Sequence, residues 1–370
     1  MSSFSVHPVV EQYDTFAGYA EAHPLGEEVL ILTNEFIYEP FLKASAGKSH
    51  VLFQERYGKG EPNDEMIDAI RADMPAGIET ILAVGGGTVI DIAKLMVFGG
   101  EFTVDELYRG LVKAEKVREL VAVPTTCGTG SEMTNVAVTA LLKQNTKKGL
   151  ALDSMYPDRA VLIPELVSTL PYKFFATSSI DAMIHAVESY VSPKANCFTE
   201  MFSKHALEKI LGGYRYMQKA GNEAWSDRAE DFLVGSNYAG IAFGNAGVGA
   251  VHALSYPLGG MYHIPHGESN MLMFSEVFRT YKAKQPEGKI ELLEQMLGEI
   301  LEVPAEKALA ELDALLNHVL HCGKLHEYGV KEEDLPVFAK SVIEGQQRLL
   351  NNNYTPLSYE DMMAIYRARF

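Results

Sequence analysis

The sequence predicts an α/β N-terminal domain with a parallel sheet, followed by an all-α C-terminal domain. In the first half of the chain, short apolar strand patterns alternate with helical patterns. From about Leu170 onward, long amphipathic segments follow one another with few strand patterns. Alternation of strand and helix is typical of parallel sheets with crossover helices. Because prolines in PELVSTLP (164–171) interrupt both patterns, we place the first domain at 1–166 and the second at 167–370.

The strands of the first domain are predicted from apolar runs bounded by glycine, proline and polar residues. Strands are expected at 28–33, 51–53, 80–84 and 119–123, with helices over 64–71 and 89–98. In the second domain, helical periodicity predicts helices at 180–192, 198–218, 226–243, 269–283, 288–300, 305–320, 333–349 and 358–368.

Composition excludes several classes of protein. The chain has 370 residues and a formal net charge of −17, so nucleic acids and anionic membranes are poor partners. It has no apolar run long enough to span a membrane and no signal-peptide pattern. Cys127, Cys197 and Cys322 are scattered and form no CxxC motif. Such scattered cysteines are typical of proteins in a reducing compartment, so we expect a cytoplasmic protein. Because nucleic acids and membranes are poor partners, we expect it to act on a small molecule.

Two glycine- or hydroxyl-rich loops follow predicted strands. Gly85-Gly86-Gly87-Thr88 precedes a predicted helix, whose N-terminal amides could bind phosphate. This loop lacks GxGxxG, because Ile90 occupies the third glycine position, so a plain strand-to-helix turn remains an alternative. The second loop is PTTCGTGS (124–131). Two such loops at the carboxyl ends of neighbouring parallel strands could bind several phosphate and ribose oxygens. They therefore suit a dinucleotide better than a single phosphate.

Four residues of the second domain could hold one divalent metal ion. Asp181 and His185 are four apart on a predicted helix, for which Thr177, Ser178 and Ser179 are the expected start. The alternative is a capping aspartate and an ordinary core histidine. His252 follows small residues, and His266 lies in IPHGE, which we read as a turn. One carboxylate and three imidazoles would make a Lewis-acid site for an alcohol or carbonyl oxygen.

Four ordered motifs resemble the iron-containing alcohol dehydrogenase family. They are GGGTVIDIAK, VPTTCGTGSE, SIDAMIHAVESYVS and HALSYPLGGMYHIPHGESN. Further segments, including LPYKFFATSS and EGQQRLLNNNY, resemble the bacterial 4-hydroxybutyrate dehydrogenases within it. The resemblance implies a dinucleotide-binding first domain, a metal-binding second domain and an active site in the cleft between them. It implies NAD-dependent interconversion of 4-hydroxybutyrate and succinate semialdehyde, and we expect a homo-oligomer.

The resemblance also implies roles for individual residues. Asp181, His185, His252 and His266 would bind one ion, usually Fe²⁺ and sometimes Zn²⁺. Asn135 and Phe243 would line the reacting pocket. The cofactor would contact Gly85, Gly86, Gly87, Thr88, Thr125, Thr126, Gly128 and Lys148.

The chain departs from the family at two positions. Many members have aspartate where this chain has Asn34; a carboxylate there bonds the adenosine ribose and repels a 2′-phosphate. NAD remains the expected cofactor, with Glu35 as a source of the missing charge. Members often have a histidine where this chain has Tyr256, and a histidine appears instead at His263. Either side chain, or water, could relay the proton.

A hydroxy acid also needs a partner for its carboxylate, because an unpaired buried carboxylate is costly. Candidates are Arg348 with Asn352, Lys194, and His263, each of which could equally be solvated or structural. Three other functions stay open: an alcohol dehydrogenase for another small primary alcohol or aldehyde, a lyase of the same fold, and a non-catalytic metal- or nucleotide-binding protein.

Overall fold

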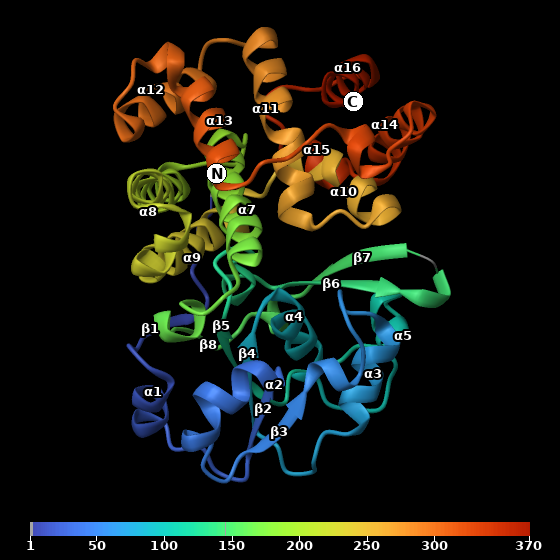
Figure 1. Ribbon diagram of the computed structural model, residues 1–370. Coiled ribbons are helices and arrows are strands. Elements are labelled where there is room, and N and C mark those ends of the chain that lie inside the picture. The colour runs from blue at the N-terminus through green and yellow to red at the C-terminus, as the bar shows by residue number, and fades with distance from the viewer. Residues whose placement is uncertain (1–2, 145) are drawn as a thin grey trace. The chain divides into compact units, whose positions relative to one another are not determined.

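A parallel sheet organises the first half of the chain (Figure 1). The computed structural model describes residues 3–144 and 146–370. Residues 6–170 form one compact unit, and residues 171–370 form a second, which also includes residues 3–5. The described residues give a six-stranded sheet in the first unit and a largely helical second unit, which confirms the predicted fold class.

The strand order of the sheet is β1-β8-β5-β4-β2-β3, and every neighbouring pair is parallel. The four predicted strands are confirmed as β2 (Val29–Thr33), β3 (His50–Phe53), β4 (Thr80–Gly85) and β5 (Glu119–Pro124). Two further strands, β1 (Val9–Gln12) and β8 (Arg159–Leu162), were not predicted. Most of β1 is exposed, so this strand depends on pairing with β8 rather than on an apolar run of its own.

The prediction also lacked an antiparallel hairpin of β6 (Val136–Leu141) and β7 (Thr146–Ala151). Residues alternate between buried and half-buried along β6, whereas β7 (TKKGLA) is mostly exposed. A polar strand with a glycine has a weak sequence signal, because what stabilises it is pairing with its neighbour.

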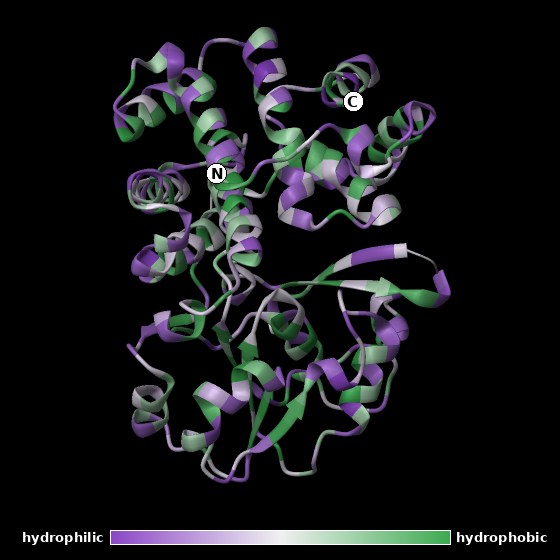
Figure 2. Ribbon diagram, in the orientation of Figure 1, coloured by the Kyte–Doolittle hydropathy of each residue, from purple (hydrophilic) through white to green (hydrophobic). Residues whose placement is uncertain are grey.

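Successive residues of β2 belong to two different hydrophobic clusters. Leu30 and Leu32 pack in one cluster, and Val29 and Ile31 pack in the other. Both faces of the sheet are therefore covered, as its continuous apolar strands require. Figure 2 shows this hydrophobic character along the strands. The helices of this unit are α1 (Phe16–Ala22), α2 (Glu35–Ile37), α3 (Asp64–Ala72), α4 (Gly87–Met96), α5 (Val104–Tyr108) and α6 (Pro164–Val167).

The second unit is built from helices that largely follow the predicted stretches. They are α7 (Tyr172–Val191), α8 (Cys197–Ala220), α9 (Ala229–Ala246), α10 (Ala250–Tyr262), α11 (His266–Lys284), α12 (Lys289–Leu301), α13 (Ala308–Val319), α14 (Leu335–Gly345), α15 (Gln347–Leu350) and α16 (Tyr359–Arg369). No helix in residues 3–144 and 146–370 has the length and apolar character to cross a membrane.

Two helical predictions need correction, and one helix was missed. Helix α7 begins at Tyr172, so Thr177, Ser178 and Ser179 lie inside it, where their hydroxyls bond to preceding carbonyl oxygens. The single helix expected over 333–349 divides into α14 and α15 at Gln346. Helix α10 was not predicted because Pro257 and two glycines interrupt its helical pattern.

Candidate functional site

Three helices of the second unit bring the four predicted metal ligands together. Asp181 and His185 lie on α7, His252 lies on α10, and His266 is the first residue of α11 rather than part of a turn. The Nε2 atoms of His252, His266 and His185 lie 3.5, 3.7 and 4.0 Å from Asp181 Oδ1. A first-row divalent ion binds such atoms at about 2 Å, so the separations suit one shared ion.

The cluster is buried on one side and open on the other. Asp181, His185 and His252 are nearly inaccessible, and their ligand atoms lie within 4.8 Å of one another. The side chain of His266 is 39% exposed. An ion here would therefore have three fixed ligands and one toward solvent, which is compatible with a substrate oxygen approaching from the His266 side.

His252 carries the clearest sign that a ligand belongs in the cluster. Its Nδ1 lies 2.6 Å from Glu188 Oε2, and the other Glu188 oxygen accepts the Val251 amide at 2.7 Å. A carboxylate can only accept, so Nδ1 carries the proton and Nε2 is a bare acceptor in neutral His252. That Nε2 atom is buried and has no hydrogen-bond partner among the described residues. A buried polar atom needs one, and a metal ion would supply it.

Asn270 completes the polar surroundings of the cluster. Its Nδ2 donates to Asp181 Oδ1 at 2.7 Å and lies 3.2 Å from His266 Nε2. This contact ties α11 to α7 beside the ligands. Glu188 and Asn270 were not predicted, although each lies on the ligand face of its helix, three residues after His185 and four after His266.

The ionisation of the cluster reflects its mutual contacts. Burial alone raises the pKa of Asp181, but the charges of His185, His266 and His252 hold that pKa below its usual range. Burial lowers the pKa of His252, yet the neighbouring carboxylates of Asp181 and Glu188 outweigh that effect and raise the pKa to about 9. The site thus favours a negative carboxylate and nearby positive charge, as a dication would supply.

The two proton-relay candidates differ in position. The Tyr256 ring is half-buried, and its centroid lies 6.3 Å from that of His266. His263 is exposed at the C-terminal end of α10, where its backbone has a left-handed φ of 55°. Of the two, Tyr256 is the one with a ring contact to the ligand cluster among the contacts described.

The substrate candidates are also dispersed. Phe243 stacks on His185 with ring centroids 4.2 Å apart, so it lies beside the cluster of proposed metal ligands. Arg348 is exposed on α15, and Lys194 is exposed after α7. Asn352 is buried, and its side-chain amide donates to the carbonyl oxygen of Val248 at 3.1 Å. Val248 lies in the turn between α9 and α10.

The two glycine- and hydroxyl-rich loops lie side by side in the first unit. They follow β4 and β5, whose ends pair Gly85 with Pro124, and the Thr125 amide donates to Gly85 O at 3.1 Å. A Cβ on Gly86 would lie 3.3 Å from Thr126, and one on Gly87 would lie 2.9 Å from Thr129. These glycines allow the loops to approach each other at the N-terminus of α4, where backbone amides can bind a phosphate.

A buried lysine of α4 fixes the second loop against that helix. Lys94 Nζ donates to Ser131 Oγ at 2.6 Å, Thr134 Oγ1 at 3.2 Å and Val136 O at 2.7 Å. Asp91, one turn earlier on α4, accepts from Ser131 Oγ at 2.6 Å. Burial lowers the pKa of Lys94, and the charge of Asp91 partly offsets that effect. This pair in GGGTVIDIAK therefore has a structural role that the motif alone did not reveal.

The remaining cofactor candidates lie in the two loops, on β7 and directly after β2. Thr88 is half-buried in the first turn of α4, and Gly128 is buried in the second loop. Lys148 is exposed on β7, with its Nζ 3.4 Å from Tyr108 O. Asn135, which was predicted to line the reacting pocket rather than to bind the cofactor, donates to Asp153 Oδ1 at 3.3 Å. Asn34 follows β2 and donates to Gln54 Oε1 at 3.3 Å and to Glu55 Oε2 at 2.8 Å.

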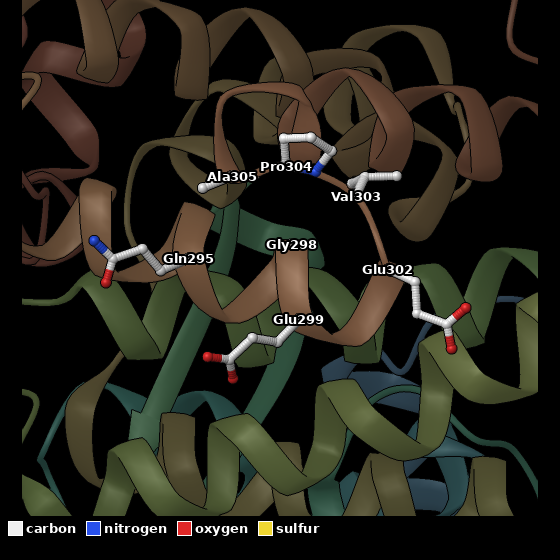
Figure 3. A pocket seen from close by; sticks show the side chains of 7 residues that line it. All are labelled: Gln295, Gly298, Glu299, Glu302, Val303, Pro304 and Ala305. Carbon is white, nitrogen blue, oxygen red and sulfur yellow. The ribbon is translucent and has the colours of Figure 1, made fainter.

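A surface hollow at the end of α12 is unrelated to this chemistry. Its lining residues are Gln295, Gly298, Glu299, Glu302, Val303, Pro304 and Ala305 (Figure 3). None of them is a ligand candidate, and the hollow is wide open to solvent.

Comparisons with known proteins agree with both halves of this description. Residues 14–164 match the iron-containing alcohol dehydrogenase family, and residues 175–370 match the C-terminal part of the Fe-containing alcohol dehydrogenase family. The chain is 52% identical over 370 residues to 4-hydroxybutyrate dehydrogenase of Clostridium kluyveri, covering 99% of each chain.

Two solved structures share the fold. Sulfoacetaldehyde reductase of Bifidobacterium kashiwanohense, solved in complex with NAD+, has a TM-score of 0.85 at 22% identity and covers 100% of this chain and 98% of its own. A 1,3-propanediol oxidoreductase has a TM-score of 0.83 at 24% identity and covers all of both chains. The family matches span both units of the chain, which therefore belongs to the iron-containing alcohol dehydrogenase family.

Proposed function

We propose that the protein is an NAD-dependent oxidoreductase that interconverts 4-hydroxybutyrate and succinate semialdehyde. The observation that carries this proposal is the 52% identity, over 99% of both chains, to a protein with that substrate in its name. Relatives at about 30% identity include dehydrogenases of other alcohols, so the substrate rests on the closer similarity rather than on family membership.

The metal-ligand cluster supports the chemistry. We propose Asp181, His185, His252 and His266 as ligands of one Fe²⁺ ion, with Zn²⁺ as the alternative. When bound, such an ion acts as a Lewis acid that lowers the pKa of an alcohol. Glu188 holds His252 in the tautomer that a metal ligand requires, and Asn270 orients Asp181. Phe243 stacks on the His185 ring and so helps to fix its orientation.

The paired loops after β4 and β5 support NAD binding. We propose that Gly85, Gly86, Gly87 and Thr88 hold the pyrophosphate at the N-terminus of α4, with Thr125, Thr126 and Gly128 opposite. When bound, the nicotinamide accepts a hydride from the carbinol carbon. We also retain Lys148 and Asn135 as proposed contacts with the cofactor and the substrate, and Arg348 as a proposed partner of the substrate carboxylate.

The test is a substrate panel with purified, metal-loaded protein. NADH absorbance is followed with succinate semialdehyde, propanal and sulfoacetaldehyde, each at several concentrations. We expect the highest kcat/KM with succinate semialdehyde, and oxidation of 4-hydroxybutyrate in the reverse direction. A higher kcat/KM with propanal would assign the protein to another small aldehyde, and no NADH oxidation with any of them would contradict the oxidoreductase proposal.

Two broader expectations stay predictions. The described cysteines are all free, which is compatible with the reducing cytoplasm that the sequence suggested. The homo-oligomeric state implied by the family resemblance can be tested by light scattering on the eluted protein.

A further inference from the structure

A polar cluster of Asn34, Gln54 and Glu55 lies just beyond β2 and β3. Asn34 Nδ2 donates to Gln54 Oε1 at 3.3 Å and to Glu55 Oε2 at 2.8 Å. Glu55 Oε1 accepts the Glu35 amide at 2.6 Å, so both of its oxygens are held. Gln54 is itself fixed, because it is buried and its amide donates to Gly58 O at 3.0 Å. Hydrogen bonds therefore fix the side chains of this cluster, which do not simply extend into solvent.

These contacts decide which end of the Asn34 amide remains available. The Glu55 carboxylate can only accept, so the Asn34 nitrogen must face it. Both Nδ2 hydrogens then have acceptors, in Glu55 and Gln54. What Asn34 can offer to a ligand is its carbonyl oxygen, which only accepts. In hydrogen bonding, a neutral asparagine held this way behaves like a carboxylate.

The sheet places this cluster beside the phosphate-binding loop. Strand β2 lies between β4 and β3, and Leu32 is in register with Ala83 while Thr33 is in register with Phe53. The glycine loop begins at the end of β4, so Asn34 follows one strand away and Glu55 two strands away, at about 4.8 Å per strand. In this fold type, the acidic group that bonds the adenosine ribose 2′-hydroxyl lies beside the phosphate-binding turn in the same way.

Both acidic and basic side chains surround the cluster. Among the acidic ones, Glu55 is hydrogen-bonded to Asn34. Glu35 is 57% exposed, and its carboxylate lies 3.9 Å from Arg56, which also covers the Phe53 ring at 4.5 Å. Arg56 therefore balances Glu35, whereas the Glu55 carboxylate has no cation within ion-pair distance among the described residues. The source of charge suggested by the sequence, Glu35, is the weaker candidate.

We infer that Glu55 is a specificity-determining residue that makes the protein select NAD over NADP. It orients Asn34 as an acceptor for the ribose 2′-hydroxyl, and its own charge repels a 2′-phosphate. A phosphate at that position would face the Asn34 carbonyl oxygen and the Glu55 carboxylate, both of which can only accept hydrogen bonds. This inference rests on the proposed NAD-dependent function.

The test measures binding rather than turnover. Dissociation constants for NADH and NADPH are determined from nicotinamide fluorescence with the metal-loaded protein, in the wild type, Glu55→Gln and the double variant Asn34→Asp/Glu55→Gln. We expect the wild type to favour NADH. Glu55→Gln should shrink the NADPH-to-NADH ratio of dissociation constants by about 10-fold, because one charge near the phosphate is lost. The double variant moves the charge to position 34 and should restore the ratio.

Glu39→Gln is the matched control, because Glu39 is an exposed glutamate of the same unit that pairs with Lys43 at 2.8 Å. It should leave the ratio unchanged. An unchanged ratio in Glu55→Gln with normal NADH binding would overturn this inference alone, as would a shift seen in Glu35→Gln instead. Equal wild-type affinity for the two dinucleotides would also overturn it. A wild type that binds neither dinucleotide would overturn the proposed function together with the inference.

Discussion

At the scale of single residues, Glu188 determines how His252 can act. Both side chains are almost inaccessible, and Glu188 also accepts the amide at the start of α10. Glu188→Gln keeps the volume but replaces one acceptor oxygen with a donor nitrogen, which clashes with either the His252 N–H or the Val251 N–H. We expect metal affinity to fall by about 10–100-fold, measured by chelator competition.

Glu294→Gln provides a control for the Glu188 variant. Glu294 is another buried glutamate of the helical unit, and it pairs with Lys282 rather than with a ligand histidine. Its replacement should leave metal affinity unchanged. Equal affinity loss in the two variants would mean that a general loss of stability, and not the orientation of His252, explains the result.

The proton relay is the second question at this scale. Tyr256 is half-buried near His266, whereas His263 is exposed at a helix end. We expect Tyr256→Phe to slow alcohol oxidation by about 10²-fold or more and to alter the pH–rate profile. His263→Asn should change the rate little, because asparagine tolerates the left-handed backbone at this position. The reverse pattern would assign the relay to His263, and small effects in both would assign it to water.

Residues whose own atoms would bind the metal were easier to predict from the sequence than residues that position other side chains. Asp181, His185, His252 and His266 were predicted from residue type and spacing, and the structure brings them together. Glu188, Asn270 and Glu55 were not predicted, because glutamate and asparagine occur everywhere on protein surfaces. Their roles depend on a partner 64, 89 or 21 residues away, which only the fold reveals.

At the scale of elements, the packing of α11 on α7 positions His266 against Asp181. A Cβ added to Gly267 would lie 2.0 Å from Thr177 O, so the two helices touch through backbone atoms. Gly267→Ala would force them apart beside the ligands. We expect a loss of about 3 kcal/mol in the free energy of unfolding, measured with denaturant, together with weaker metal binding.

Gly260→Ala is the matched control, because Gly260 lies in α10 and, among the described residues, no atom outside its own stretch of helix lies within 4 Å of the added Cβ. Alanine favours a helix more than glycine does, so this variant should gain up to about 1 kcal/mol. A Gly267→Ala protein as stable as the wild type would show that α11 can shift without cost.

The elements themselves were predictable where the sequence period was long. Strands β2, β4 and β5 are continuous apolar runs, and the predicted helices have clear amphipathic periods. The missed elements depend on context. Strand β1 is exposed along most of its length and is ordered by pairing with β8, and α10 retains its helix despite Pro257 because it is buried among neighbouring helices.

At the scale of the whole molecule, the ligand cluster joins helices that are far apart in the chain. An ion bound to α7, α10 and α11 would link residues 181 to 266, and the native state alone has this arrangement. A ligand that binds only the native state stabilises it by about 2.7 kcal/mol at 100 times its dissociation constant. Removal of the metal with a chelator should therefore lower the Tm, and Fe²⁺ or Zn²⁺ should restore it.

His266→Ala tests whether the ion is responsible for that stabilisation. The side chain of His266 is 39% exposed and contributes little to the core, so the metal-free variant should melt close to the metal-free wild type. Loss of one ligand should nevertheless remove most of the metal-dependent increase in Tm and abolish turnover. If the variant retained both the increase and its bound metal, as measured by elemental analysis, the ion would have to bind outside the cluster of Asp181, His185, His252 and His266.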